Sequence, residues 1–185
     1  MNYTELVKDC VRGKAKAQKQ LYDMFAENML GVCYRYTRSL TDAEDVLQDG
    51  FVKVFQNLHQ YKFEGELGGW IRRIMVNTAL NYLKRESRYH HDEIGEDSSY
   101  QIAAKDNPEL HLSAKEIAQL IRKLPTGYRT IFNLHAVEGF THVEIAKMLE
   151  INEGTSRSQY ARARNLLIQW YNQTQSFKVS NYVGE

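Results

Sequence analysis

Hydrophobic residues recur every three or four positions along most of this 185-residue chain, which is the spacing of one face of an α-helix. No run alternates strictly between hydrophobic and polar residues, as a half-buried strand would. The three clearest stripes are Leu21, Phe25, Met29, Val32 and Tyr36; Leu47, Phe51, Val54, Phe55 and Leu58; and Ile71, Ile74, Met75, Thr78 and Tyr82. The pattern therefore predicts an all-α protein.

Three capping boxes predict where helices begin, because a hydroxyl and a carboxylate three residues later satisfy the first backbone N–H groups of a helix. The pairs are Thr41 with Glu44, Ser113 with Glu116, and Thr141 with Glu144. Residues 91–112 break the helical pattern and carry six acidic residues, two serines and one proline, which is typical of a flexible linker. We therefore predict two helical domains, 1–90 and 113–175, an acidic linker over 91–112, and a tail over 176–185.

The composition narrows the class of protein. The formal net charge is +1 and 43% of the residues are hydrophobic, as in ordinary globular proteins. Cys10 and Cys33 form no C-x-x-C motif, which excludes a disulfide framework and fits a reducing cytosol. The amino terminus has no signal-peptide core, and no run of 18 apolar residues occurs, so we expect a cytoplasmic protein.

The sequence contains no enzyme motif that we can identify. P-loop, G-x-S-x-G and H-E-x-x-H sequences are absent, so we predict no catalytic residue and no cofactor. The segment His90–Glu93 holds two histidines and two acids without the spacing of metal ligands, so we predict no metal site. Three other histidines are scattered along the chain and are interpreted as surface or packing residues: His111, His135 and His142.

The carboxyl-terminal part has the pattern of a helix-turn-helix motif. A short capped helix over Phe140–Leu149 is followed by a turn, Glu150–Gly154, and by a longer helix, Thr155–Tyr171. No acidic residue occurs from Gly154 to Gly184. In this motif the second helix enters the major groove of DNA, where arginine, serine and amide side chains bond to bases or phosphates. The alternative is a basic helix that packs on a protein. The candidate DNA-binding residues are Thr155, Arg157, Ser158, Arg162 and Asn165.

A second candidate surface for nucleic acid is predicted in the first domain. The segment Leu67–Arg85 contains no acidic residue, and it follows a glycine-rich stretch that holds Tyr61 and Phe63. Such residues suit single-stranded nucleic acid, whose bases stack on aromatic rings, although aromatic residues in this pattern also form hydrophobic cores. The polar residues that share one face of this helix, opposite its hydrophobic stripe, are Arg73, Asn77, Asn81 and Lys84.

The predicted helix Asp42–Leu58 has a second face that carries carboxylates. This face lies apart from the hydrophobic stripe and would repel DNA. It is therefore either plain solvent-exposed surface or a protein-binding face, and periodicity does not distinguish the two. Its residues are Asp45, Gln48, Asp49, Val52 and Gln56.

Taken together, these motifs resemble bacterial RNA polymerase sigma factors of the sigma-70 family, extracytoplasmic-function subclass. Asp42–Phe55 resembles the polymerase-binding helix of conserved region two, and Trp70–Leu83 resembles its minus-ten recognition helix. Leu124–Ala146 with the following GTSRSQYARAR resembles region four, which reads the minus-thirty-five element. The resemblance implies a region 2-like helical bundle and a region 4-like helix-turn-helix domain, joined by the flexible linker.

The resemblance also implies roles for individual residues. Those implied to dock on the clamp helices of the largest polymerase subunit are Asp45, Gln48, Asp49 and Val52. Those implied to bind the minus-ten element, together with a loop over 63–69 that captures a flipped base, are Phe63, Trp70, Arg73, Asn77, Asn81 and Lys84. Those implied to bind the minus-thirty-five element are Thr155, Arg157, Ser158, Arg162 and Asn165.

The resemblance finally implies partners. A member of this family is expected to be a non-catalytic initiation factor that binds core RNA polymerase and promoter DNA and is monomeric when free of partners. An anti-sigma factor, often a membrane protein, is a further implied partner, and no small-molecule substrate is expected. The alternatives are a helix-turn-helix regulator whose first domain senses a ligand or dimerises, and a helical adaptor that binds only protein.

Overall fold

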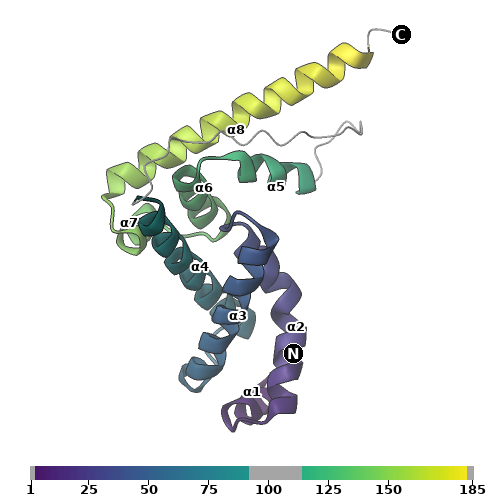
Figure 1. The fold of residues 1–185 in the computed structure, drawn as a ribbon, viewed down its shortest axis with the longest axis vertical. Helices are drawn as coiled ribbons and strands as arrows, with labels where there is room; N and C mark the ends of the chain where they lie inside the picture. The colour runs from purple at the N-terminus through teal and green to yellow at the C-terminus, as the bar shows by residue number, and fades with distance from the viewer. Residues whose placement is uncertain (1–2, 92–113, 183–185) are drawn as a thin grey trace. The chain divides into compact units, whose positions relative to one another are not determined.

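A computed structural model of the chain describes residues 3–91 and 114–182, and these ranges contain helices but no β-strand. The all-α prediction is confirmed. Internal contacts divide the chain into two compact units, Met1–Gly95 and Glu96–Glu185 (Figure 1). The predicted linker lies almost wholly outside the described residues. Within the described ranges, no helix is long and apolar enough to cross a lipid bilayer.

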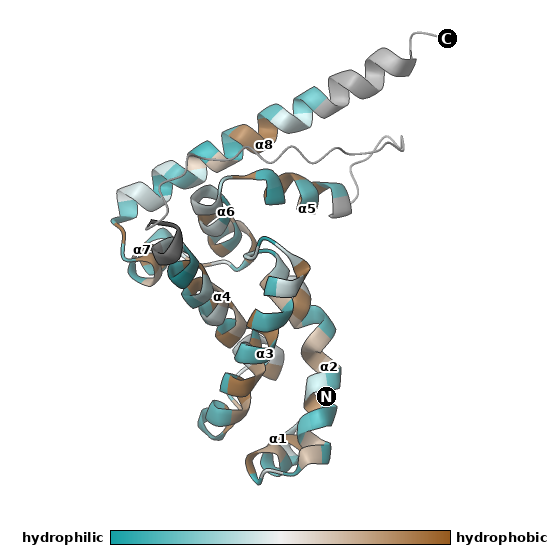
Figure 2. Ribbon diagram, in the orientation of Figure 1, coloured by the Kyte–Doolittle hydropathy of each residue, from teal (hydrophilic) through white to brown (hydrophobic). Residues whose placement is uncertain are grey.

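Unit 1 is built from helices that bury the predicted hydrophobic stripes against one another. Its elements are α1 (Thr4–Val11), α2 (Ala15–Tyr34), α3 (Leu40–Asn57), the 3-10 turn η1 (Leu58–Gln60) and α4 (Leu67–His91). Helices α2, α3 and α4 pack mutually, and α1 packs on α2. Leu21, Val54 and Met75, one from each of these three helices, are fully buried. Each helix also presents hydrophilic residues, visible as teal in Figure 2.

The start of α3 differs from the prediction. Ser39, not Thr41, is the N-cap, and its backbone is extended (φ −122°, ψ 168°). The backbone N–H of Asp42 donates to the Ser39 hydroxyl over 3.1 Å, and that of Ser39 donates to the Asp42 carboxylate over 3.0 Å. Because this box already satisfies the first donors of the helix, Thr41 lies inside its first turn. The Thr41–Glu44 prediction was therefore wrong.

The other two predicted caps have different outcomes. Thr141 and Glu144 form a capping box at the start of α7, as predicted. Ser113 lies outside the described residues.

Unit 2 contains the predicted helix-turn-helix. Its elements are α5 (Ala114–Lys123), α6 (Thr126–Phe132), the π-helical turn η2 (Asn133–Val137), α7 (His142–Leu149) and α8 (Glu153–Tyr182). Helix α8 packs on α6 and α7, and more lightly on α5. Leu134, Ile145 and Ala163 are fully buried where these elements meet.

The turn between α7 and α8 also differs from the prediction. The left-handed residue that ends α7 is Glu150 (φ 57°), although this conformation favours glycine. Gly154 instead lies in the first turn of α8. The backbone N–H of Thr155 donates to the Asn152 side chain over 2.7 Å, so Asn152 caps the helix. Helix α8 starts two residues earlier than predicted and continues to Tyr182.

Candidate protein and nucleic-acid interfaces

The outward face of α3 carries all four predicted docking residues. Asp45, Gln48, Asp49 and Val52 are exposed, and 55% of the surface of Val52 is accessible. The opposite side of the same helix is buried in the core through Val46, Gly50 and Val54. The helix is thus fixed by its apolar side and presents two carboxylates, an amide and an exposed valine together. A single exposed apolar residue is ordinary on a protein surface, so the geometry keeps this face as a candidate for protein binding without deciding between a partner and solvent.

The outward face of α4 carries the predicted basic and amide residues. Arg73, Asn77 and Asn81 are exposed, and Lys84 is half-buried. Ile71, Met75, Val76 and Ala79, on the other side of the helix, are buried. Thr78 is also buried, and its hydroxyl donates to the Ile74 carbonyl over 2.8 Å. Thr78 was predicted to belong to the hydrophobic stripe, and it can be buried there because its hydroxyl group is hydrogen-bonded within the helix.

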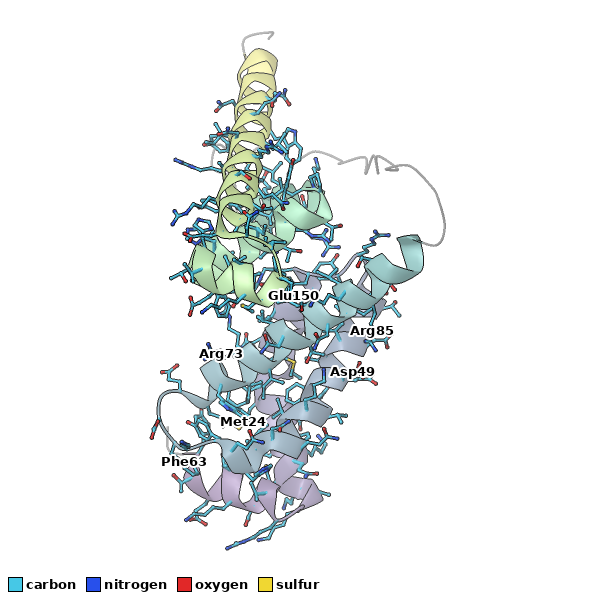
Figure 3. All side chains as sticks on the ribbon, turned by 90° about the vertical axis from the view of Figure 1, so that its left-hand side faces the viewer. Met24, Asp49, Phe63, Arg73, Arg85 and Glu150 are labelled. Carbon is cyan, nitrogen blue, oxygen red and sulfur yellow. The ribbon has the colours of Figure 1, made fainter. Side chains whose placement is uncertain are left out.

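A shallow groove joins these two faces, which the sequence had treated separately. It is lined by Asp49, Val52, Lys53, Gln56, Asn81, Lys84 and Arg85. Arg85 Nη2 lies 3.6 Å from Asp49 Oδ2, and Figure 3 shows the two residues on adjoining helices. Both side chains are largely exposed, so the ion pair contributes at most about 1 kcal/mol. It brings a cation beside the proposed docking face.

Two basic residues of this groove were missed by reasoning from the sequence. Lys53 interrupts the carboxylate-bearing helix, and its Nζ donates to the Thr78 hydroxyl over 3.2 Å. Arg85 ends the acid-free segment of α4. Helical periodicity gives the direction of each side chain around its own axis but not which neighbouring helix faces it, so no sequence pattern placed these cations together with Asp49.

In the loop before α4, the ring of Tyr61 contacts one aromatic ring of the loop and one of the first turn of α4. The ring of Tyr61 lies 5.1 Å from that of Phe63 and 5.7 Å from that of Trp70, between centroids. Phe63 is 47% exposed, and Trp70 is half-buried in the first turn of α4. The sequence left open whether these rings belong to the core. The structure places Phe63 on the surface and Trp70 at the boundary.

In unit 2, the first turns of α8 present the predicted DNA-binding residues. Arg157, Ser158, Arg162 and Asn165 are exposed, whereas Thr155 is half-buried. The Thr155 hydroxyl donates to the Asn152 side chain over 3.0 Å, so it takes part in the helix cap. The other side of α8 is held by buried Ser156 and Ala163. The structure therefore fixes the helix so that a row of polar side chains faces outward.

One predicted DNA-binding residue already has a partner within the chain. Arg157 Nε donates to Glu153 Oε1 over 2.9 Å. Glu153 was predicted to lie in the turn, so the helix was expected to be free of acids, but α8 begins at Glu153. Contact of Arg157 with DNA would require exchange of this surface ion pair, which costs little.

A histidine pair lies where η2, α7 and α8 meet. The rings of His135 and His142 stack with centroids 4.2 Å apart, and Tyr160 meets the His135 ring edge-on at 4.6 Å. His142 Nδ1 lies 2.9 Å from the buried Ser156 hydroxyl. Burial, the neighbouring His135 and the charge of Arg157 hold the pKa of His142 below its usual value. Both histidines are packing residues, as one of the two interpretations had it, but their positions along the chain did not predict that the two rings touch.

The described residues contain no group of three or more histidine, cysteine or acidic side chains arranged to hold a metal ion. Side chains of the predicted His90–Glu93 segment, and His111, are outside that description. Cys10 and Cys33 are both buried free thiols, and burial raises the pKa of Cys33 to about 12. The described residues therefore present three exposed polar faces, on α3, α4 and α8, as the candidate binding surfaces.

Comparison with known proteins gives consistent matches over both units. Residues 21–89 match the family described as Sigma-70 region 2, and residues 111–167 match Sigma-70, region 4. The ECF RNA polymerase sigma-E factor of Haemophilus influenzae is 30% identical over 173 residues, which cover 88% of this chain and 91% of that protein. The RNA polymerase sigma-H factor of Pseudomonas aeruginosa is 30% identical over 174 residues, with coverage of 88% and 90%.

Among solved structures, the chain resembles the sigma factor RpoE of Bartonella quintana, crystallised in complex with the anti-sigma factor NepR. The TM-score is 0.54 at 20% sequence identity, and the match covers 83% of this chain and 96% of that one. At this identity the likeness concerns the fold.

Proposed function

The chain belongs to the sigma-70 family of RNA polymerase sigma factors, in the extracytoplasmic-function subclass, and from this premise we propose which of its faces bind polymerase and which bind promoter DNA. A sigma factor directs core RNA polymerase to promoters and is not itself an enzyme. The membership decides against the two alternatives, a ligand-sensing regulator and a protein-only adaptor. Because the polymerase and the chromosome are cytoplasmic, we place the protein in the cytoplasm.

The outward face of α3, formed by Asp45, Gln48, Asp49 and Val52, is the proposed docking surface for core polymerase. Its carboxylates would repel DNA but suit a basic protein surface. Val52 supplies an apolar centre that loses water on docking. The buried side of α3 fixes the backbone of these four residues before any partner arrives, so binding has only their side chains to order.

The outward face of α4 and the aromatic loop before it form the proposed minus-ten surface. Asn77 and Asn81 offer amides to base edges, Arg73 and Lys84 offer charge to phosphates, and Phe63 offers a ring on which a base can stack. An extruded base gains these contacts only in the open promoter. Binding therefore shifts the equilibrium from duplex toward open DNA without covalent chemistry.

The first turns of α8 form the proposed minus-thirty-five surface. Arg157 and Arg162 present guanidinium groups to guanine or phosphate, and Ser158 and Asn165 offer shorter hydrogen bonds to base edges. Thr155 positions the helix start through its bond to Asn152. As an additional partner we propose an anti-sigma factor, which would bind this protein and hold it from polymerase.

The observation that carries the proposal is the arrangement in unit 1, where an exposed carboxylate face on α3 lies beside an acid-free face on α4, both fixed by one core. The separation of faces predicts that polymerase binding can be removed without unfolding the domain.

Asp49→Lys combined with Gln48→Ala should weaken association with core polymerase at least about 30-fold, the effect of losing a hot spot.

A matched control is available on α2. Glu27 and Asn28 are exposed there, so Glu27→Lys with Asn28→Ala makes the same change of charge and loses one amide away from the proposed face. Affinity for core is measured by fluorescence anisotropy of the labelled full chain, and circular dichroism reports on folding. Equal affinities of the two double variants, with normal helical spectra, would reject the docking surface.

A further inference from the structure

The loop between η1 and α4 closes on itself through Tyr61. The Tyr61 hydroxyl donates to the carbonyl of Gly65 over 2.9 Å. Within the closed segment, Phe63 has φ 60° and Gly65 has φ 84°. Glycine adopts this left-handed conformation freely, but for phenylalanine it is costly and persists only where the surroundings impose it. The Tyr61–Gly65 hydrogen bond ties together the two residues that flank Phe63 and so helps to impose it.

Tyr61 also supports the Phe63 ring directly. Its ring contacts both of the other rings, with centroid distances of 5.1 Å to Phe63 and 5.7 Å to Trp70. Trp70 belongs to the first turn of α4 and is half-buried. The contacts therefore connect the exposed ring of Phe63, through Tyr61, to a helix that is part of the core. Figure 3 shows Phe63 in this loop, beside the helix that carries Arg73.

The charges in the loop indicate which part of a nucleic acid it can hold. Glu64 and Glu66 are exposed and lie on either side of Gly65, so a phosphate would be repelled here, although Lys62 offsets part of that charge. A base has no net charge, and its flat surface stacks on an aromatic ring. The loop thus suits an unpaired base rather than the backbone.

We infer that Tyr61 is a positioning residue that holds Phe63 ready to stack on a base extruded from the minus-ten element. This inference rests on the function proposed above for the loop. Its physical content is preorganisation: a ring already held in its binding position loses less freedom when the base arrives. Removing the Tyr61 hydroxyl should weaken that hold, and removing its ring should weaken it further.

The hold on Phe63 can be measured without DNA. The probe is 4-fluorophenylalanine introduced at position 63 of the full chain, and its fluorine relaxation reports the mobility of that ring. Tyr61→Phe keeps the ring and loses the hydrogen bond, and Tyr61→Leu loses both. Tyr22→Phe is the matched control, because Tyr22 packs its ring on Phe51 elsewhere in the same unit. Mobility should rise from the parent to Tyr61→Phe and again to Tyr61→Leu, and should not change in the control.

The same variants are then assayed as holoenzyme on two templates, a fully duplex promoter and one with a pre-opened bubble that keeps the minus-ten bases. Tyr61→Phe should lower run-off transcription from the duplex template by about two- to tenfold, the effect of one hydrogen bond. Tyr61→Leu should lower it further. Both losses should be smaller on the bubble template, and affinity for core polymerase should be unchanged.

The other outcomes would each overturn the inference in a distinguishable way. Unchanged Phe63 mobility in both Tyr61 variants would show that Tyr61 does not position the ring. Increased mobility with unchanged duplex transcription would show that the positioning exists but that the loop has no part in opening, so the function proposed for the loop would fail. Equal losses on both templates, accompanied by weaker core binding, would show that Tyr61 only stabilises the domain.

Discussion

The close approach of α3 and α4 at Gly50 is what holds the two proposed surfaces of unit 1 at a fixed spacing. Gly50 lies on the buried side of α3, next to Asp49 and near Val52. A Cβ atom at this position would overlap Sδ of Met75 on α4 and would lie 3.0 Å from its Cε. Met75 is itself fully buried, so the end of its side chain must repack within the core to admit the added methyl group.

Two opposing effects decide the outcome of Gly50→Ala. Alanine stabilises a helix interior over glycine by about 0.8–1.0 kcal/mol, whereas an extra methyl group in a well-packed core costs about 1–3 kcal/mol. Gly31 in α2 is a matched control, because a Cβ atom there would meet nothing within 4 Å. Gly31→Ala should raise the free energy of unfolding by about 0.5–1 kcal/mol. Gly50→Ala should give a value about 1–3 kcal/mol below that of the control variant.

Urea unfolding in a Trp170→Phe background measures this difference, because Trp70 is then the sole tryptophan and reports on unit 1. Met75→Ala should cost less in the Gly50→Ala background than in the parent, since the space it leaves accommodates the added methyl group. Equal effects of the two glycine substitutions would show that α3 and α4 are not closely packed at Gly50, as would strictly additive effects of Gly50→Ala and Met75→Ala.

Two further predictions concern unit 2. Arg157→Ala and Arg162→Ala should each weaken binding of duplex minus-thirty-five DNA. If the arginine contacts a base, the loss should be about 1–3 kcal/mol with relaxed specificity at one position; if it contacts a phosphate, binding should weaken evenly across sequences and the salt slope should fall by about 1. Unchanged affinity in both variants would show that α8 is not part of the DNA-binding surface. The pKa of His142 is lower in the folded chain than the unperturbed 6.5. Below about pH 6.5 the unfolded chain therefore binds more protons than the folded chain, and the stability of unit 2 should fall as the pH drops below that value. The difference between the urea midpoints at pH 7.5 and 5.5 measures this fall in stability. His142→Gln should reduce the fall, and the control His59→Gln, at an exposed position, should leave it unchanged. An identical fall in the parent and both variants would show that His142 is not its cause.

The hydrophobic periodicity predicted the architecture because it reports directly on which side of each helix is buried. Leu21, Val54 and Met75 belong to the predicted stripes and are buried. The faces opposite those stripes, with Asp49 and Asn77 among them, are exposed. Residue type and spacing along one helix are sufficient for this result, since a helix fixed by one side must present the other.

Features that depend on more than one element were not accessible in the same way. The stack of His135 on His142 joins residues from η2 and α7, and the groove that brings Arg85 to Asp49 joins α4 to α3. Neither contact can be predicted from the hydrophobic periodicity of a single helix. The helix start at Ser39 was missed because two overlapping boxes compete there, and only the three-dimensional path of the chain selects one of them.

Bound to core polymerase, this chain is expected both to select and to open promoters. Selection and opening are tested together by the yield of run-off transcript from purified core polymerase on a duplex template and on a template with a pre-opened bubble that keeps the minus-ten bases. A suitable promoter is found by mapping the 5′ ends of transcripts that the reconstituted enzyme makes from genomic DNA. The proteins compared are the wild-type chain and a variant carrying Asn77→Ala and Asn81→Ala, both exposed positions on α4.

Core polymerase alone should make no specific transcript, and addition of the wild-type chain should produce one. The asparagine variant should bind core normally and lose most of its transcript on the duplex. It should recover part of that transcript on the bubble, because the unpairing cost of a few kcal/mol is removed in advance. The contrary result is that the wild-type chain binds promoter DNA but gives a specific transcript only when a second sigma factor is supplied. That result would show that this chain does not itself initiate transcription.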